Sequence, residues 1–292
     1  MENNINAKLI SSAKISFLFG SGVNGSLFPQ LSGFARTIDK IKEVLKMEAI
    51  NPNHIEDLIS QISDIKIRNS VLSIFKEEIR EFNERVDYNK ESSSNLSNLF
   101  LIINKFIQFE ENRTHRTKQV NVFTLNYDTI VDNILLKSGL FFNVLTPQNV
   151  KKKTYLYSLI GQDYLTKKYK TTFLVSKIHG TVEEPILPGL AKFDELLAEK
   201  YFEILFNMKS ILRQPNSVLF IIGYSGNDKH INQMVADCFD SGLTVFWLSF
   251  DKKSSIPYDL LDFVKVIDQP DDSSQDTTKI LYKELEQLWD IK

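Results

Sequence analysis

The chain has 292 residues, a formal net charge of -2, eleven glycines and a single cysteine. Basic and acidic residues nearly cancel, so we expect no direct nucleic-acid binding. One cysteine, Cys238, forms neither an internal disulfide nor a zinc ribbon, and we predict no metal. No apolar run approaches the roughly 18 residues of a membrane span, and the first residues lack a signal-peptide pattern. We therefore expect a cytoplasmic protein that makes no membrane contact.

Short apolar runs recur along the chain. Most of them are followed by a short polar or glycine-rich segment, which we call a polar switch. They cover residues 15–19, 120–124, 172–175, 218–222 and 243–248. Apolar runs flanked by helices are typical of parallel strands buried on both faces. Helical patterns begin at Asp128 and Asp228, which are typical N-caps, and end near Gly139 and Gly242. The sequence predicts an α/β fold, a Rossmann-like doubly wound parallel sheet.

The stretch between the first two predicted strands is helical in pattern. We predict a helical insertion over residues 36–117, with a polar loop at 87–95, while residues 1–35 and 118–292 form the nucleotide-binding core. The Lys- and Tyr-rich segment 151–170 fits either a hairpin or a loop. A polar, acidic stretch at 268–278 is expected to be a surface loop before a C-terminal helix that contains Leu281, Leu285 and Leu288.

The first polar switch has the spacing Gly20-x-Gly22-x-x-Gly25 directly after a predicted strand. This pattern is typical of a dinucleotide-binding loop, in which backbone amides and a helix N-terminus approach a diphosphate. The alternative is a glycine turn that serves only tight packing of strand and helix. Asp39 lies where a dehydrogenase carries its ribose-binding acid, but inside a helical pattern, which argues against hydride transfer.

The switches after the other strands also carry chemistry. Asn126 is not needed for its turn, and its amide is suited to orient a water and hold a ribose hydroxyl; a structural role is the equal alternative. Asp128 taken alone fits a helix cap better than a ligand. His179 follows a predicted buried strand, where a neutral imidazole is suited to act as a general base; a structural histidine is the alternative. The third switch, residues 223–228, offers a second phosphate or ribose clamp.

Taken together, these switches resemble the sirtuin family. In chain order the motifs are Gly20-Ser21-Gly22-Val23-Asn24, Thr124-Leu125-Asn126-Tyr127-Asp128, His179-Gly180 and Gly223-Tyr224-Ser225, similar to the family's first glycine loop, Thr-x-Asn-x-Asp motif, catalytic His-Gly and Gly-x-Ser clamp. The resemblance covers roughly residues 10–35 and 118–250, and it includes neither the helical insertion nor the C-terminus. The four motifs occur in the same order as in the family and each follows a predicted strand, and this combination identifies the family more specifically than any single motif does.

The resemblance implies a site for NAD+. By this resemblance Asn126 holds the nicotinamide ribose and the attacking water or acceptor, His179 is the base, Asp128 binds the carboxamide, and the glycine loops hold the diphosphate. The predicted catalytic residues are thus Asn126 and His179, and the predicted NAD+-binding residues are Gly20, Ser21, Gly22, Asn24, Asp128, Gly223, Ser225 and Asp228.

Two departures set the chain apart from the deacylases of the family. It cannot build their four-cysteine zinc ribbon, and it has a long helical insertion after the first loop. These features resemble sirtuin-like effectors of bacterial anti-phage systems, which hydrolyse NAD+ to starve an infected cell. The resemblance implies a NAD+ glycohydrolase in antiviral (abortive infection) defence, a homo-oligomer activated by self-assembly or by a partner such as a HerA-type ATPase.

Two rival hypotheses remain open. The first is a protein deacylase or ADP-ribosyltransferase that uses the same NAD+ site. The second is a non-catalytic scaffold that senses NAD+ or ADP-ribose without turnover.

Overall fold

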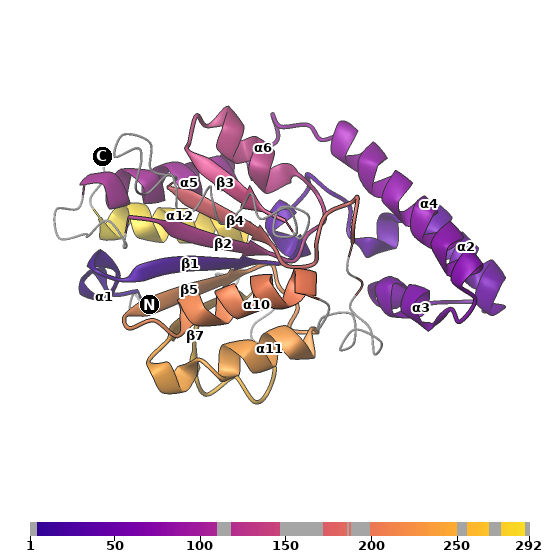
Figure 1. The fold of residues 1–292 in the computed structure, drawn as a ribbon. Coiled ribbons are helices and arrows are strands. Elements are labelled where there is room, and N and C mark those ends of the chain that lie inside the picture. Colours follow the sequence, from indigo (N-terminus) through magenta and orange to yellow (C-terminus); the bar gives the residue numbers. More distant parts are fainter. Residues whose placement is uncertain are drawn as a thin grey trace.

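The structure is a computed structural model that describes residues 5–109, 118–146, 172–185, 187, 199–249, 256–268 and 276–289. Its centre is a seven-stranded parallel sheet with the order β3-β4-β2-β1-β5-β6-β7 (Figure 1). The strands are β1 (Lys14–Phe19), β2 (Val120–Thr124), β3 (Phe142–Leu145), β4 (Phe173–Lys177), β5 (Ser217–Ile222), β6 (Thr244–Ser249) and β7 (Val264–Asp268). The predicted α/β fold with a doubly wound parallel sheet is confirmed.

The strand order reverses between β1 and β5, which lie side by side in the middle of the sheet. Phe17 of β1 is in register with Val122 of β2 on one side and with Phe220 of β5 on the other. Crossovers therefore leave β1 and β5 in opposite directions, and a crevice opens beyond their carboxyl ends. The loops after β1, β2, β4 and β5 converge on this crevice.

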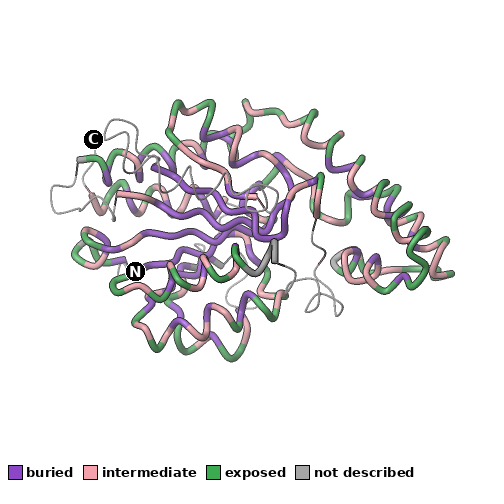
Figure 2. Tube along the Cα trace, in the orientation of Figure 1, coloured by how far each residue is buried: buried purple, intermediate pink, exposed green. Residues whose placement is uncertain are grey.

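Helices cover both faces of the sheet and bury its side chains (Figures 1 and 2). On one face Phe17, Phe220 and Phe246 pack in a row beneath α5 (Glu91–Phe109), α6 (Ile130–Lys137) and α12 (Thr277–Leu288). On the other face Leu219 and Trp247 pack against α10 (Glu199–Leu212) and α11 (Lys229–Ala236). A short helix, α1 (Ala7–Ser11), precedes β1. Burial on both faces explains why these strands read as continuous apolar runs.

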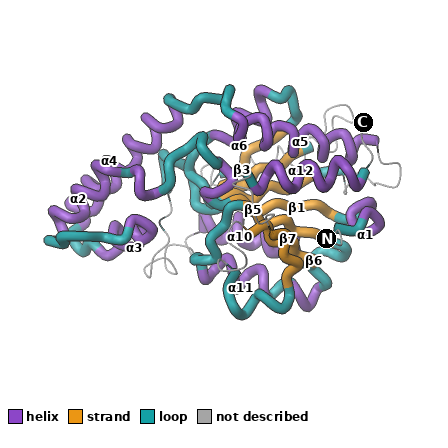
Figure 3. The backbone as a smooth tube through the Cα atoms, turned by 180° about the vertical axis from the view of Figure 1, so that it is seen from behind, coloured by secondary structure: helices purple, strands orange, loops and turns teal. Residues whose placement is uncertain are grey.

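A second group of helices, α2 (Ala35–Leu45), α3 (Ile55–Gln61) and α4 (Ile65–Glu84), lies to one side of the sheet (Figure 3). We call residues 34–84 the helical unit. It has its own apolar cluster around Phe34 and Phe75, which Tyr127 and Val182 join from the core. By contrast α5, which also falls within the predicted insertion, packs on the sheet and against α12. The domain limits at residues 36 and 117 stay a prediction.

The predicted helix ends lie at or near those in the structure, although α11 itself ends at Ala236 and a separate 3₁₀ helix, Phe239–Ser241, precedes Gly242. Gly139 and Gly242 have positive φ, 67° and 82°, and terminate the segments after α6 and α11. Asp228 caps α11, because its Oδ1 accepts hydrogen bonds from the backbone N–H groups of His230 and Ile231 at 2.9 and 3.2 Å. Asp128 lies one residue before the cap of α6, and its Oδ1 accepts from the N–H of Ile130 at 3.0 Å.

Some predicted elements need correction. The first glycine loop does not open an α-helix; residues Ser21–Asn24 form a single 3₁₀ turn. The loop predicted at 87–95 is shorter, since α5 begins at Glu91. Strands β3 and β7 are edge strands that the sequence reading missed. Segment 151–170 and most of the predicted loop at 268–278 lie outside the described residues. None of the described helices is long and apolar enough to cross a membrane.

Candidate functional site

A cavity of about 510 Å³ lies at the carboxyl ends of the central strands, between the sheet and the helical unit. The predicted site residues Gly20, Ser21, Asn24, Asn126, Asp128, His179, Gly223, Ser225 and Asp228 line it, and Gly22 does not. The helical unit adds further lining residues, among them Phe34, Glu56 and Phe75. Residues far apart in the sequence thus meet at the crevice where the strand order reverses, although their individual roles stay predictions.

The glycines after β1 and β5 pack against one another. A Cβ on Gly20 would lie 2.4 Å from the carbonyl oxygen of Gly223, and a Cβ on Gly22 would lie 2.8 Å from the Cα of Gly223. Gly223 has a φ of 65°, and a Cβ there would lie 2.1 Å from the backbone nitrogen of Val23. The N–H of Gly22 donates to the Gly223 carbonyl at 2.9 Å. Close packing of two loops therefore requires these glycines, whether or not a diphosphate also binds them.

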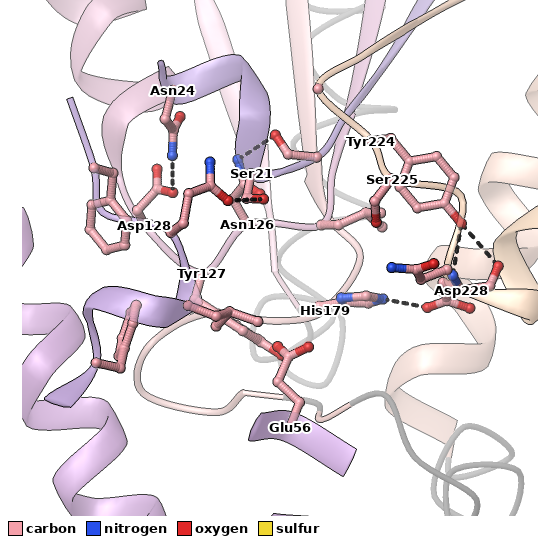
Figure 4. A pocket seen from close by; sticks show the side chains of 18 of the residues that line it. Ser21, Asn24, Glu56, Asn126, Tyr127, Asp128, His179, Tyr224, Ser225 and Asp228 are labelled. Carbon is pink, nitrogen blue, oxygen red and sulfur yellow. Dashed lines mark hydrogen bonds and ion pairs between the residues drawn. The ribbon is translucent and has the colours of Figure 1, made fainter. Parts of the chain in front are cut away.

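His179, which is buried, and Asp228, which is half-buried, form a pair on one wall of the cavity (Figure 4). The distance from His179 Nε2 to Asp228 Oδ2 is 3.0 Å, and each side chain is only 9% exposed. The other oxygen of Asp228 caps α11, so a helix N-terminus holds the carboxylate in place. A carboxylate on one ring nitrogen selects the tautomer and stabilises the imidazolium that forms when the ring accepts a proton. The predicted role of Asp228 toward NAD+ stays a prediction.

Asn126 is held by the loop after β1. Its Nδ2 donates to the carbonyl oxygen of Gly20 at 3.1 Å, and its backbone N–H donates to Thr124 Oγ1 at 3.1 Å. No described residue donates a hydrogen bond to Asn126 Oδ1. The amide is therefore fixed through its nitrogen, and its oxygen is the atom that can accept a hydrogen bond from a water or a hydroxyl.

Asp128 is a buried carboxylate with a neighbouring amide and a neighbouring cation. Asn24 Nδ2 donates to Asp128 Oδ2 at 2.7 Å, while Asn24 Oδ1 is buried and accepts no hydrogen bond in the described part of the chain. Burial raises the pKa of Asp128, although the nearby Lys177 ammonium opposes this. Lys177 Nζ donates to the backbone carbonyl of Asp128 at 2.6 Å and pairs with Asp132 at 3.1 Å. The buried lysine thereby ties the loop after β2 to the strand that leads into His179.

Four further residues at or beneath the cavity wall were missed by the sequence reading: Glu56, Tyr127, Lys177 and Tyr224. Tyr127 Oη donates to Glu56 Oε1 at 2.6 Å, and its ring centroid is 6.4 Å from that of His179. Tyr224 Oη contacts Asn232 Oδ1 at 2.8 Å and the backbone of Asp228, and burial raises the pKa of its hydroxyl. Tyr127 and Tyr224 stand inside the recognised motifs, so their positions were a usable signal. Glu56 lies in the helical unit, and nothing near it in the sequence points to the cavity.

The model of the SIR2-like domain matches residues 120–260, which contain Asn126, His179 and Asp228. No curated protein matches the chain. The crystal structure of a Sir2 homolog–NAD complex is 11% identical, with a TM-score of 0.52 over 97% of this chain and 93% of that one. The match shows that the fold is a Sir2-like Rossmann fold.

Two other solved structures are also similar. One, from work on the mechanism and regulation of Sir2 enzymes, is 10% identical and covers 98% of this chain and 96% of its own, with a TM-score of 0.42. The other, of Sir2 with a deacetylated p53 peptide and 3′-O-acetyl ADP ribose, is 11% identical and covers 96% of each chain, with a TM-score of 0.48.

Proposed function

We propose that the chain is a NAD+ glycohydrolase, which cleaves NAD+ with water into nicotinamide and ADP-ribose. The observation that carries the proposal is the arrangement of Asn126 and the His179–Asp228 pair on one cavity, beyond the carboxyl ends of the central strands. In folds of this kind, that crevice is where nucleotides bind. The NAD held by the similar Sir2 homolog supports the choice of ligand.

The chemistry suits the groups present. The bond between the nicotinamide nitrogen and C1′ of the ribose breaks, its electron pair stays with nicotinamide, and the ribose becomes oxocarbenium-like. Since cationic nicotinamide is a good leaving group, the site needs positioning and a base more than a general acid. Asn126 Oδ1 accepts a hydrogen bond from the attacking water. As the oxygen of this water bonds to C1′, His179 takes a proton from the water. Asp228 stabilises the resulting imidazolium.

The remaining polar groups bind the two ends of the substrate. Asp128, beside Asn126, receives the carboxamide of the nicotinamide, and the loops after β1 and β5 receive the diphosphate. No step of this scheme requires a metal ion.

A NAD+-dependent deacylase or ADP-ribosyltransferase is the second candidate, because the same groups would serve an acyl or protein acceptor. Two observations favour water as the acceptor. With one cysteine the chain cannot supply a four-cysteine zinc ribbon, and the helical unit supplies one wall of the cavity through Phe34, Glu56 and Phe75. A non-catalytic scaffold is the third candidate, and it requires binding without turnover.

Product analysis separates the three candidates. The full-length protein is incubated with NAD+, with and without an acetyl-lysine peptide, and nicotinamide, ADP-ribose and acetylated ADP-ribose are quantified by chromatography. Equal amounts of nicotinamide and ADP-ribose without peptide support hydrolysis. Strict dependence on the peptide would establish deacylation instead, and binding without any nicotinamide release would establish the scaffold.

We further propose that the activity depletes cellular NAD+ in anti-phage defence, and that a homo-oligomer, activated by assembly or by a HerA-type ATPase or similar sensor, carries it out in the cytoplasm. The support for this role is the resemblance of two sequence features, the lack of a four-cysteine zinc ribbon and the long helical insertion, to those of such effectors. Phage challenge of cells that express the chain with its neighbouring genes tests it. Protection that survives His179→Ala would contradict a role through NAD+ cleavage.

A further inference from the structure

The helical unit places a carboxylate on the cavity wall beside the proposed reaction centre. Glu56 lies in the first turn of α3, and its Oε1 accepts the hydroxyl of Tyr127 at 2.6 Å. Tyr127 directly follows Asn126, and its ring lies near that of His179. Figure 4 shows Glu56 below Tyr127, on the same side of the site as the imidazole. The contact therefore fixes a negative charge close to where the nicotinamide ribose would react.

The side chains that line the cavity include more carboxylates than ammonium or guanidinium groups, and the two kinds of charge lie on different parts of the wall. The carboxylates are Glu56, Asp57, Asp128 and Asp228. Among the described lining residues the only lysine or arginine is Lys229, which begins α11 beyond the loop after β5. NAD+ has the matching asymmetry, since its nicotinamide ring is cationic and its diphosphate is anionic. The wall formed by α3 and the loop after β2 thus favours a positive charge.

We infer that Glu56 is a specificity-determining residue that selects the cationic, oxidised nicotinamide over the neutral, reduced one. The inference rests on the proposed NAD+ site and names what its helical wall recognises. A carboxylate attracts the ring's positive charge in the ground state. As the glycosidic bond breaks, the charge moves to the ribose, and the same carboxylate continues to stabilise it. NADH lacks this charge but keeps the diphosphate, the adenosine and the size of the ligand.

The test must separate the charge of Glu56 from its hydrogen bond. Glu56→Gln does so, because the amide oxygen still accepts the Tyr127 hydroxyl while the negative charge is gone. The matched control is Glu84→Gln, which removes the same charge from an exposed position at the end of α4 in the helical unit. Two ligands are titrated by calorimetry into the full-length proteins. One is NADH, and the other is a carbocyclic NAD+ analogue that keeps the positive charge and is not cleaved.

We expect Glu56→Gln to weaken the cationic analogue about fivefold and NADH by less than about twofold, as the loss of one nearby charge in a partly solvated site implies. Glu84→Gln should change neither. Equal weakening of both ligands, or no change in either, would overturn the inference and leave the glycohydrolase proposal intact. If the unmodified protein binds neither dinucleotide, both proposals fail. If it binds the analogue selectively through Glu56 but never cleaves NAD+, only the glycohydrolase proposal fails.

Discussion

The crevice of the sheet and the helical unit contribute to the cavity in different ways. The crevice side is built from backbone: Gly20, Gly22 and Gly223 interlock two loops, and Asn126 is fixed by a carbonyl oxygen. The helical unit contributes side chains, and the ring of Phe34 is tilted against that of Phe75 within the unit's own apolar cluster. The proposed chemistry therefore lies at the sheet, and the proposed selectivity lies in an added helical layer.

Among the described residues, hydrogen bonds, an ion pair and ring packing join the two regions. Tyr127 donates to Glu56, Lys76 Nζ donates to the backbone carbonyl of Glu183 at 2.9 Å, and Arg80 pairs with the Glu183 carboxylate at 2.7 Å. These contacts reach the loop after β2 and the segment just after His179. Because each region has its own apolar cluster, substitutions on the two sides should have separate effects. Substitutions at the sheet should change turnover and folding, and those in the helical unit should change ligand choice and local stability.

The largest expected effect is on catalysis at the crevice. Asn126→Ala or His179→Ala should each lower NAD+ turnover by about 100-fold or more, because the water loses its orienting acceptor or its base. Initial rates of nicotinamide release measure the loss, and thermal unfolding confirms that each variant is folded. Turnover within about threefold of the unmodified protein would remove that residue from the proposed reaction.

The next largest effect is on the stability of the two interlocked glycine loops after β1 and β5. Gly223→Ala should destabilise the protein by about 3 kcal/mol or more, since the new Cβ overlaps backbone and the φ of 65° is unfavourable for alanine. Gly139→Ala is the matched control, because its φ is also positive but nothing lies within 4 Å of the new Cβ. It should cost only about 1 kcal/mol. Urea unfolding compares the two, and equal losses would contradict the interlocking of the loops.

A smaller effect tests whether the helical unit is a separate layer. Buried Glu78 of α4 accepts hydrogen bonds from the backbone N–H groups of Arg36 and Thr37 and from Thr37 Oγ1, and so caps the start of α2. Glu78→Ala should cost about 2 kcal/mol by leaving these donors without a partner. Hydrogen exchange should rise in α2–α4 and stay unchanged in β1 and β5. Exchange that rises equally in the sheet would show that the two regions unfold as one, and Glu84→Ala serves as the exposed control.

The smallest effect is a pH dependence at Asp128. Burial raises the pKa of this carboxyl in the folded state above its unfolded value. The folded state therefore holds the proton more tightly, and the stability it gains below about pH 4 is lost as the pH rises through the raised pKa. Asp128→Asn removes this titration, while Asn24 can turn its unpaired oxygen toward the new amide. Relative to the unmodified protein, the variant should gain stability with rising pH in urea unfolding, and parallel profiles would contradict the account.

The interior of the fold could be predicted from the sequence, and its edges could not. Strands such as β1 and β5 are buried on both faces, so each is a continuous apolar run. Edge strand β3 has mostly half-buried residues, so no such run marks it. The 3₁₀ turn after β1 was mistaken for a helix start because Gly-x-Gly spacing fits both, and only the packing of Gly223 against it decides.

Residues that line the candidate cavity could be predicted where a single loop after a strand contains the motif. Asn126, Asp128 and His179 each follow a strand, and strand ends meet at one edge of a parallel sheet. The contact between His179, which follows β4, and Asp228, which follows β5, depends on the order of the strands in the sheet. Sequence periodicity does not determine that order. Glu56 depends on how the helical unit packs against the core, which is a tertiary property with no local motif.

The most direct test of the central claim is the release of nicotinamide from NAD+ without any acyl acceptor. It is measured by chromatography with the full-length protein, over a wide range of protein concentration that samples self-assembly, and with the proteins encoded beside it. The account predicts equal amounts of nicotinamide and ADP-ribose, and their loss in His179→Ala. Nicotinamide release that requires an acylated peptide, or release that persists in His179→Ala, would contradict it.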